Sequence, residues 1–252
     1  MLNNLKMDVY RMTRQKSFYV ALGVLLFLFA WMLCSTGTRS DTMFASFNRK
    51  DHSTMDFLYY FPKSTIFIIG VMVFLSLFSS EEYDSGFVKN FYPLQQKKWK
   101  LLLEKWIFSF LVYAIYWVAI VGLSLLINVW VQDPFLSFSV KDYLLFSLMQ
   151  AILLGAAGSF VSMVTHCFQN KIASVMIAVA YGGAIFFVLH TGICELLPQE
   201  LSYYEQTLYY ISGTLPYTFD AEVYGKAFAI AISSTILYNG ISYIILKKKD
   251  IA

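Results

Sequence analysis

The sequence has 252 residues, of which 58% are apolar, 18% aromatic and only 14% charged, and its mean hydropathy is +0.58. Soluble domains are nearer half apolar and a quarter charged, so this composition excludes an ordinary soluble protein and predicts a membrane protein. The three cysteines lack the paired spacing of a zinc site. Whether Cys34 and Cys194 form a disulfide is left open.

Six apolar blocks are each close to the roughly 20 residues that a helix needs to cross about 30 Å of hydrocarbon. They are Phe18–Cys34, Ser64–Phe78, Trp106–Val131, Tyr143–Thr165, Ile172–His190 and Ala227–Leu246. The second block is short unless the aromatic run at residues 57–61 belongs to it. We therefore expect an all-α membrane protein in which residues 1–252 form a single transmembrane domain of six helices.

The N-terminal segment, residues 1–16, has its own pattern. Leu2, Leu5, Val9 and Met12 are three or four positions apart, and basic residues lie off that stripe. This spacing predicts an amphipathic helix in the lipid headgroup layer, with a frayed tail as the alternative. No cleavage site follows the first apolar block, so we expect that block to be a membrane span and not a signal peptide.

The basic residues are unevenly distributed between the two sides of this six-span topology. Thirteen of the nineteen Lys and Arg residues fall on the side that carries both termini. Cytoplasmic loops are enriched in Lys and Arg, so both termini are predicted to be cytoplasmic.

The longest cytoplasmic segment in this topology extends from Glu81 to Lys105, with a loop expected over residues 81–100. Glu81, Glu82 and Asp84 stand at the C-terminal, partly negative end of the second span, where the helix dipole does not favour acids. Their partner is left open. It can be a lysine of the same segment, the arginine at 11 or 14, or a basic surface of another protein.

A short helix is predicted inside this segment, because Asp84 or Ser85 can cap its start and Pro93 ends it. It would present an apolar surface made of Phe87, Val88, Phe91 and Tyr92. A helix of about two turns is marginal on its own. The aromatic side chains therefore favour docking in a groove of a partner, and insertion into the bilayer interface is the alternative.

Small residues in two spans indicate close helix packing. They recur every fourth position around Gly155 and Gly158, a spacing that lets a neighbouring helix approach. Gly182 and Gly183 predict either a kink or close contact with a neighbour. The outer segment over residues 191–226 has leucines and aromatics at helical spacing, which predicts short amphipathic helices in the outer leaflet or a lid packed on the helix ends.

Several chemistries are not supported by the sequence. There is no Gly-x-x-x-x-Gly-Lys-Ser/Thr loop for ATP, and the spans are almost free of the ionisable residues that gradient-driven transporters need. Glu81-Glu82 with His166 and His190 is similar to pieces of the glutamate-type intramembrane proteases. The order of these pieces is reversed, and the topology places the two histidines on opposite faces. We expect no catalytic residue, metal site or cofactor in this chain.

Two stretches resemble a known family. Glu82-x-x-x-Gly86, Lys89, Pro93, Lys97, Lys98 and Lys105 resemble the loop between the second and third spans of ABC-2 permeases. Asp8-Val9-Tyr10-Arg11, followed by Lys16-Ser17-Phe18-Tyr19, is similar to the opening of bacterial peptide-resistance permeases of that family.

This resemblance implies a permease that has no ATP site of its own and is driven by cytoplasmic ABC ATPase subunits, which bind ATP and Mg. The short helix would couple the two proteins. The implied coupling residues are Glu81, Glu82, Asp84, Gly86, Phe87, Lys89, Phe91 and Pro93.

The same resemblance implies further partners and a cargo. A second copy or a homologous permease would complete a dimer in the plasma membrane of a Gram-positive bacterium, in contact with lipids and without nucleic acid. The cargo would be antimicrobial, lantibiotic or amphipathic toxin peptides, or lipid-like compounds. A membrane scaffold or sensor that does not transport is the alternative function.

Overall fold

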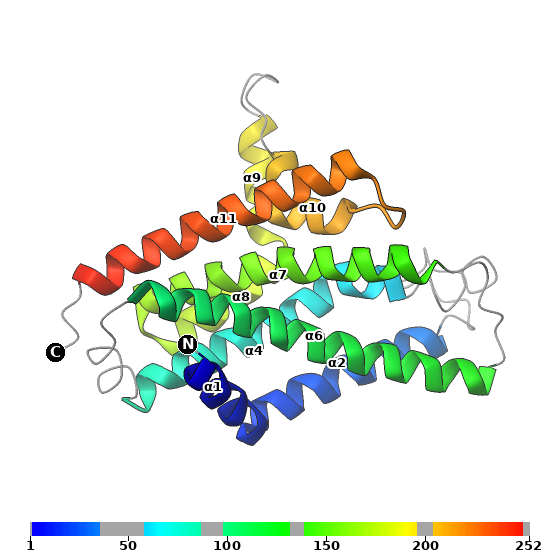
Figure 1. Cartoon of the computed structure of the whole chain (residues 1–252), viewed down its shortest axis with the longest axis horizontal. Helices are drawn as coiled ribbons and strands as arrows, with labels where there is room; N and C mark the ends of the chain where they lie inside the picture. The colour runs from blue at the N-terminus through cyan, green and yellow to red at the C-terminus, as the bar shows by residue number, and fades with distance from the viewer. Residues whose placement is uncertain (1, 36–57, 87–97, 132–138, 196–203, 249–252) are drawn as a thin grey trace.

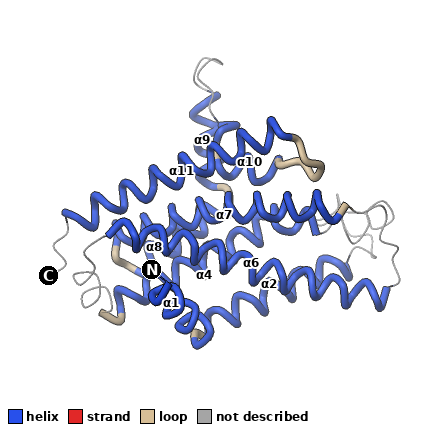
Figure 2. The backbone as a smooth tube through the Cα atoms, viewed as in Figure 1, coloured by secondary structure: helices blue, strands red, loops and turns tan. Residues whose placement is uncertain are grey.

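The computed structural model describes residues 2–35, 58–86, 98–131, 139–195 and 204–248 (Figure 1). Every regular element in these ranges is helical, as the colouring of Figure 2 shows, so the expected all-α class is confirmed. The longer elements are α1 (Leu2–Arg14), α2 (Lys16–Ser35), α4 (Thr65–Asp84), α6 (Lys98–Val131), α7 (Val140–Phe168), α8 (Lys171–Gly182), α9 (Ile185–Glu195) and α11 (Ala221–Lys248). The short ones are η1 (Phe61–Lys63), η3 (Tyr204–Gln206) and α10 (Leu208–Thr214).

In this part of the chain, four helices are long and apolar enough to cross a membrane by themselves: α4, α6, α7 and α11. Two bent pairs raise the number to six when each pair counts as one span. In the first pair α1 and α2 are bent by 67°, and in the second α8 and α9 are bent by 62°. The chain is therefore a multi-pass membrane protein with four to six spans.

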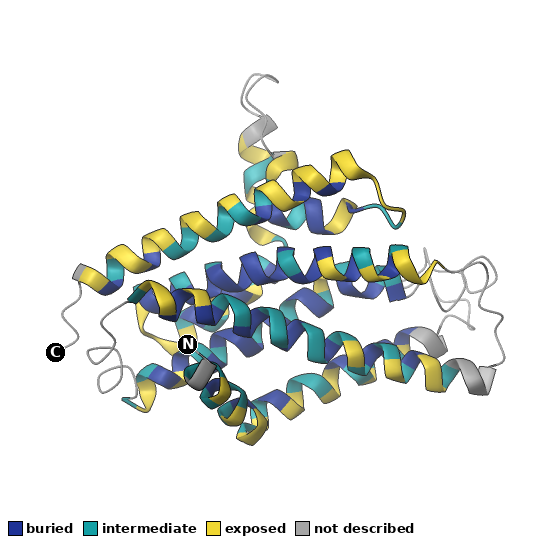
Figure 3. Cartoon of the chain, in the orientation of Figure 1, coloured by how far each residue is buried: buried dark blue, intermediate teal, exposed yellow. Residues whose placement is uncertain are grey.

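Helix α7 lies at the centre of the bundle. It packs against α4, α6, α8, α10 and α11, and its side chains are mostly buried, whereas α11 is exposed along its outer side (Figure 3). Ser139 caps the start of α7 by accepting a hydrogen bond from the backbone of Asp142, and Gln169 ends it in the left-handed conformation. Small residues on α7 let its neighbours approach, since a Cβ at Gly158 would lie 2.5 Å from the Ser109 hydroxyl of α6. Helix α6 therefore lies close to α7 at Gly158. At Gly155, a Cβ would lie 3.2 Å from the Trp106 indole.

The helices on either side of the 81–100 segment are longer than the apolar blocks predicted. Helix α4 is capped by Ser64 and continues through Glu81 and Glu82 to Asp84, so these acids belong to a helix and not to a loop. Helix α6 begins at Lys98, not at Trp106. Lys, Leu and Glu are good helix formers, so the charged residues before the apolar block extend the helix.

The fifth apolar block is one helix in the prediction and two in the structure. Helix α8 ends at Gly182, and the break is made by Gly183 and by Ala184, whose φ is +62°. A Cβ at Gly182 would lie 2.8 Å from the backbone of Ile69 in α4. Both readings of the glycine pair therefore apply: the helix is kinked, and a neighbour approaches closely.

The segment between α9 and α11 is attached to the bundle. Leu208 and Ile211 of α10 are buried, and the Gln150 amide of α7 donates a hydrogen bond of 2.7 Å to the Ser212 carbonyl. The Ser212 hydroxyl donates back to the Gln150 side-chain oxygen over 2.8 Å. Within the described residues 204–214, the segment packs as a lid on the bundle. Its first part, including Leu196, Leu197 and Leu201, lies outside the described residues.

Candidate functional site

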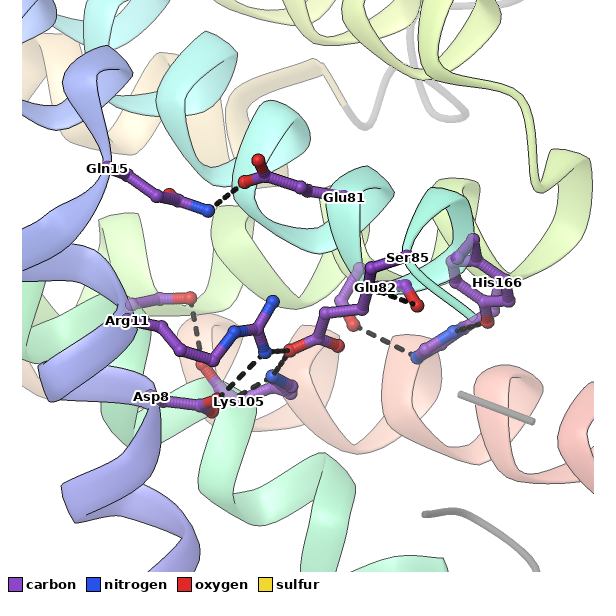
Figure 4. A network of polar contacts seen from close by, with 11 residues as sticks. Asp8, Arg11, Gln15, Glu81, Glu82, Ser85, Lys105 and His166 are labelled. Carbon is purple, nitrogen blue, oxygen red and sulfur yellow. Dashed lines mark hydrogen bonds and ion pairs between the residues drawn. The ribbon is translucent and has the colours of Figure 1, made fainter. Parts of the chain in front are cut away.

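Four charged side chains from three helices form a buried group, called the charge cluster below. It consists of Asp8 and Arg11 from α1, Glu82 from α4 and Lys105 from α6 (Figure 4). Glu82 is only 1% exposed, Asp8 2% and Lys105 8%. Charged residues are almost never buried to this extent unless they are paired.

The geometry pairs each acid with both cations. The Arg11 guanidinium donates to Glu82 Oε1 over 2.8 Å and lies 3.5 Å from Asp8 Oδ1. The Lys105 ammonium donates to Asp8 Oδ2 over 2.9 Å and also to Glu82 Oε1. Two negative and two positive charges balance, so the cluster is neutral as a whole. Helices α1, α4 and α6 are therefore linked by direct ion pairs.

The aromatic ring of Phe78 supports the two cations. Arg11 Cζ lies 5.1 Å from the ring centroid and Lys105 Nζ 5.4 Å, within the range of a cation–π interaction. Phe78 stands four residues before Glu82 on α4, which places both side chains on one face of the helix. On α1, Asp8 stands four residues before the buried Met12, so it points to the bundle in the same way.

Further polar contacts connect the same end of the bundle. Gln15 donates a hydrogen bond to Glu81, and the Tyr83 hydroxyl is hydrogen-bonded to Nδ1 of His166, at the end of α7. The Lys98 ammonium donates to the Leu246 carbonyl of α11 over 2.6 Å. The segments that were predicted to share one membrane side thus meet at one end of the molecule, where Figure 1 also places the N-terminus.

The predicted coupling residues have different surroundings in the structure. Glu81 and Asp84 are exposed, whereas Glu82 faces the cations of its own chain, so two of the partners left open for the acids, Arg11 and a lysine of the same segment, are found. Gly86 ends the helix region with φ +70°, a conformation that favours glycine. The remaining ones, Phe87, Lys89, Phe91 and Pro93, lie outside the described residues, as do the side chains of Cys34 and Cys194.

Sequence reasoning missed the role of Asp8 and did not bring it together with Lys105. A signal was present, because Asp8 is the one acid among the first sixteen residues and stands next to the apolar stripe of α1. An acid in that position needs a buried cation. The separation of 97 residues between Asp8 and Lys105 hid which cation it would be.

The arrangement connects three helices of the bundle through buried ion pairs. The opposite charges of the cluster are paired with one another. Within the described ranges, no group of three or more His, Cys, Asp or Glu side chains could hold a metal ion. Separating a buried ion pair is costly, at about 3–5 kcal/mol when one partner is removed. The three helices are therefore expected to move as one body.

Comparison with known proteins identifies the family to which this chain belongs. A family model described as ABC-2 family transporter protein matches residues 5–184, which include the whole charge cluster and helices α2 to α8. No curated protein matches the chain. The match covers well over half of the sequence, and members of this family are membrane subunits that associate with a cytoplasmic ABC ATPase. The chain belongs to the ABC-2 family of transporter proteins and is a multi-pass permease subunit of an ABC transporter.

Proposed function

We propose that this permease exports amphipathic or antimicrobial peptides, or lipid-like compounds, with energy from ATP hydrolysed by its partner ATPase. The proposed transmission of movement from the ATPase to the membrane helices rests on the charge cluster, which joins α1, α4 and α6. The residues between α4 and α6 are the ones that resemble the coupling segment of the family. The cluster stands close to both ends of that segment, at Glu82 and at Lys105.

The coupling step follows from this placement. A push on residues 87–97 reaches α4 at Asp84 and α6 at Lys98, because the segment is continuous with both helices. The ion pairs of Glu82 and Lys105 with Asp8 and Arg11 then transmit the displacement to α1. Exposed Glu81 and Asp84 and the aromatic pair Phe87 and Phe91 are proposed to contact the ATPase, and Glu82 acts by positioning α1.

The assembly that fits this proposal is a dimer in the plasma membrane of a Gram-positive bacterium. Its second half is another copy of this chain or a homologous permease, and both termini face the cytoplasm with the ATPases. The excess of Lys and Arg on that side supports the orientation. The partner subunits bind ATP and Mg, and the largely uncharged, aromatic spans suit an amphipathic cargo.

The test is co-purification of a cytoplasmic ABC ATPase that is produced together with tagged permease variants. Phe87→Ala and Phe91→Ala are expected to release the ATPase and to abolish its stimulation by permease. Phe228→Ala is the matched control, because this exposed phenylalanine lies on α11, away from the coupling segment. Unchanged ATPase binding and stimulation in both coupling variants would overturn the proposed contact.

A second measurement separates export from a scaffold or sensor role. Reconstituted complexes are supplied with a panel of labelled amphipathic peptides, and both ATP hydrolysis and peptide movement into the vesicle lumen are recorded. Export predicts ATP-dependent accumulation of at least one peptide. Stimulated hydrolysis without accumulation of any peptide would favour the sensor.

A further inference from the structure

A cavity of about 430 Å³ lies between α7, α8, α9, η3, α10 and α11. Its wall is formed by Phe160, Tyr181, Phe186, Phe187, His190, Gln206, Thr207, Leu208, Tyr209, Ser234 and Tyr238. Cavities that bind small molecules range from about 300 to 1,000 Å³. The size therefore suits a compact organic group. Most of the wall belongs to residues beyond 184, outside the family match.

The aromatic rings of this cavity form two groups. Phe160 of α7 is surrounded by Tyr181, Tyr238 and Phe186, with ring centroids 5.0, 5.3 and 6.3 Å away. On the other side, Phe187 of α9 stacks on Tyr209 at 5.6 Å. Five helices thus contribute rings to the wall of one cavity. The Phe186 side chain is 42% exposed, so the cavity is reachable from outside.

The kind of side chain in the wall distinguishes a ring-lined site from an ordinary apolar groove. Six of the eleven lining residues are aromatic, Leu208 is the one aliphatic residue among them, and none is Asp, Glu, Lys or Arg. The face of an aromatic ring carries partial negative charge and attracts organic cations, whereas it gives a plain hydrocarbon chain no such advantage. Groups of aromatic rings are the usual recognition sites for quaternary ammonium groups.

A second cavity of about 400 Å³ provides the internal contrast. It lies between α2, η1, the start of α4 and α10, and its wall contains Leu28, Met32 and Ile66 besides aromatic residues. It also contains Lys63. The cationic Lys63 opposes the entry of another cation. The two cavities are similar in size, and a lysine lines only the second of them.

We propose that the ring-lined cavity between α7, α8, α9, α10 and α11 binds an organic ammonium group, such as the quaternary ammonium head of an amphipathic molecule. The rings of Phe160, Tyr181 and Tyr238 pack together as one part of the wall that the cation would contact, and the polar side chains of Gln206 and Ser234 lie at the same wall. The binding inference does not rest on peptide export, because a site for ammonium groups can be measured without the ATPase.

The test uses the full chain in lipid nanodiscs made without choline lipids, with binding to empty nanodiscs subtracted. Benzyltrimethylammonium is the probe, and neopentylbenzene, its uncharged isostere, is the comparison. Both are measured by equilibrium dialysis. We expect the cation to bind about tenfold or more tightly than the isostere, because several rings contribute to its binding.

Substitutions then locate the site. Phe160→Leu and Tyr238→Leu remove a ring but keep an apolar side chain, and each is expected to weaken binding of the cation about three- to tenfold while the isostere changes little. Tyr238→Phe keeps the ring and is expected to retain the affinity. Trp31→Leu, in the wall of the second cavity, is the control and is expected to have no effect.

Three outcomes would overturn the inference. Equal affinity for the cation and the isostere would show an apolar site without cation preference. Binding of the cation that is unchanged in Phe160→Leu and Tyr238→Leu would place it elsewhere. The absence of saturable binding in the unsubstituted chain would mean that there is no site. Elution of each variant as a single symmetric peak in size-exclusion chromatography shows that a loss is not caused by unfolding.

Discussion

Replacement of Lys105 by Met tests the charge cluster most directly. The change keeps the apolar stem but removes the positive charge, so a neutral cluster becomes one with a net charge of −1. Glu82 retains Arg11 at 2.8 Å, whereas Asp8 is left with Arg11 at 3.5 Å. Removing one partner of a buried ion pair costs about 3–5 kcal/mol. We expect a loss of this size in the free energy of unfolding.

The assay is equilibrium unfolding in mixed detergent and SDS micelles, followed by circular dichroism. The control is Lys226→Met, which removes a lysine from an exposed ion pair with Glu222 in α11. Exposed pairs contribute little to stability, so this variant is expected to unfold like the unsubstituted chain. Equal stability of Lys105→Met and Lys226→Met would refute the reasoning.

A second substitution shows whether charge balance or packing is responsible. Adding Asp8→Asn to Lys105→Met removes the excess carboxylate and makes the cluster neutral again. Residues in one ion-pair network are coupled by about 0.5–3 kcal/mol. The double variant is therefore expected to be more stable than Lys105→Met alone. A further loss of stability on adding Asp8→Asn would contradict the electrostatic explanation.

Three other predictions concern a close helix contact, a pair of hydrogen bonds and the titration of a buried lysine. Gly182→Ala is expected to lower the free energy of unfolding by about 1–3 kcal/mol because of overpacking, whereas Gly240→Ala, with open space at the Cβ position, is expected to raise it slightly in the same unfolding assay. Gln150→Leu removes both hydrogen bonds to Ser212 and is expected to speed amide hydrogen exchange in residues 204–214, with no change there as the contrary result. Burial lowers the pKa of Lys63 from its ordinary 10.5 to about 8. The folded state therefore binds this proton less tightly than the unfolded state does, so the free energy of unfolding should increase as the pH is raised from 8 to 9.5. Lys63→Met should remove this rise, and an identical pH profile would contradict it.

The sequence predicts the helices of this protein better than their ends. Apolar blocks identify the residues that suit the hydrocarbon core of the bilayer. A helix can continue beyond the boundary of that core. Helix α6 shows this, because it begins at Lys98, eight residues before the apolar block at Trp106. Helix α4 shows it too, since it carries its acids to Asp84.

The candidate site was partly predictable. The acids near Glu82 are unfavourable at a helix C-terminus, which indicates that they need a cation, and Arg11 was among the alternatives. The choice among those alternatives depends on how α1, α4 and α6 pack, and contacts between residues 71 to 97 positions apart leave no local spacing to read. Gly182 illustrates the same limit, because its local pattern allowed a kink or a neighbour and the packed structure has both.

The bend between α8 and α9 has a consequence for the energetics of the fifth apolar block. Ala184 adopts the left-handed conformation, which costs a residue with a side chain about 1–2 kcal/mol. The local backbone would therefore favour a straight helix, and packing of the surrounding helices has to supply the difference. The free-energy difference that favours the bent form over a straight helix is consequently smaller than it would be with a glycine at position 184. If a neighbouring helix packs less tightly against α8 or α9, the backbone preference of Ala184 favours the straight form.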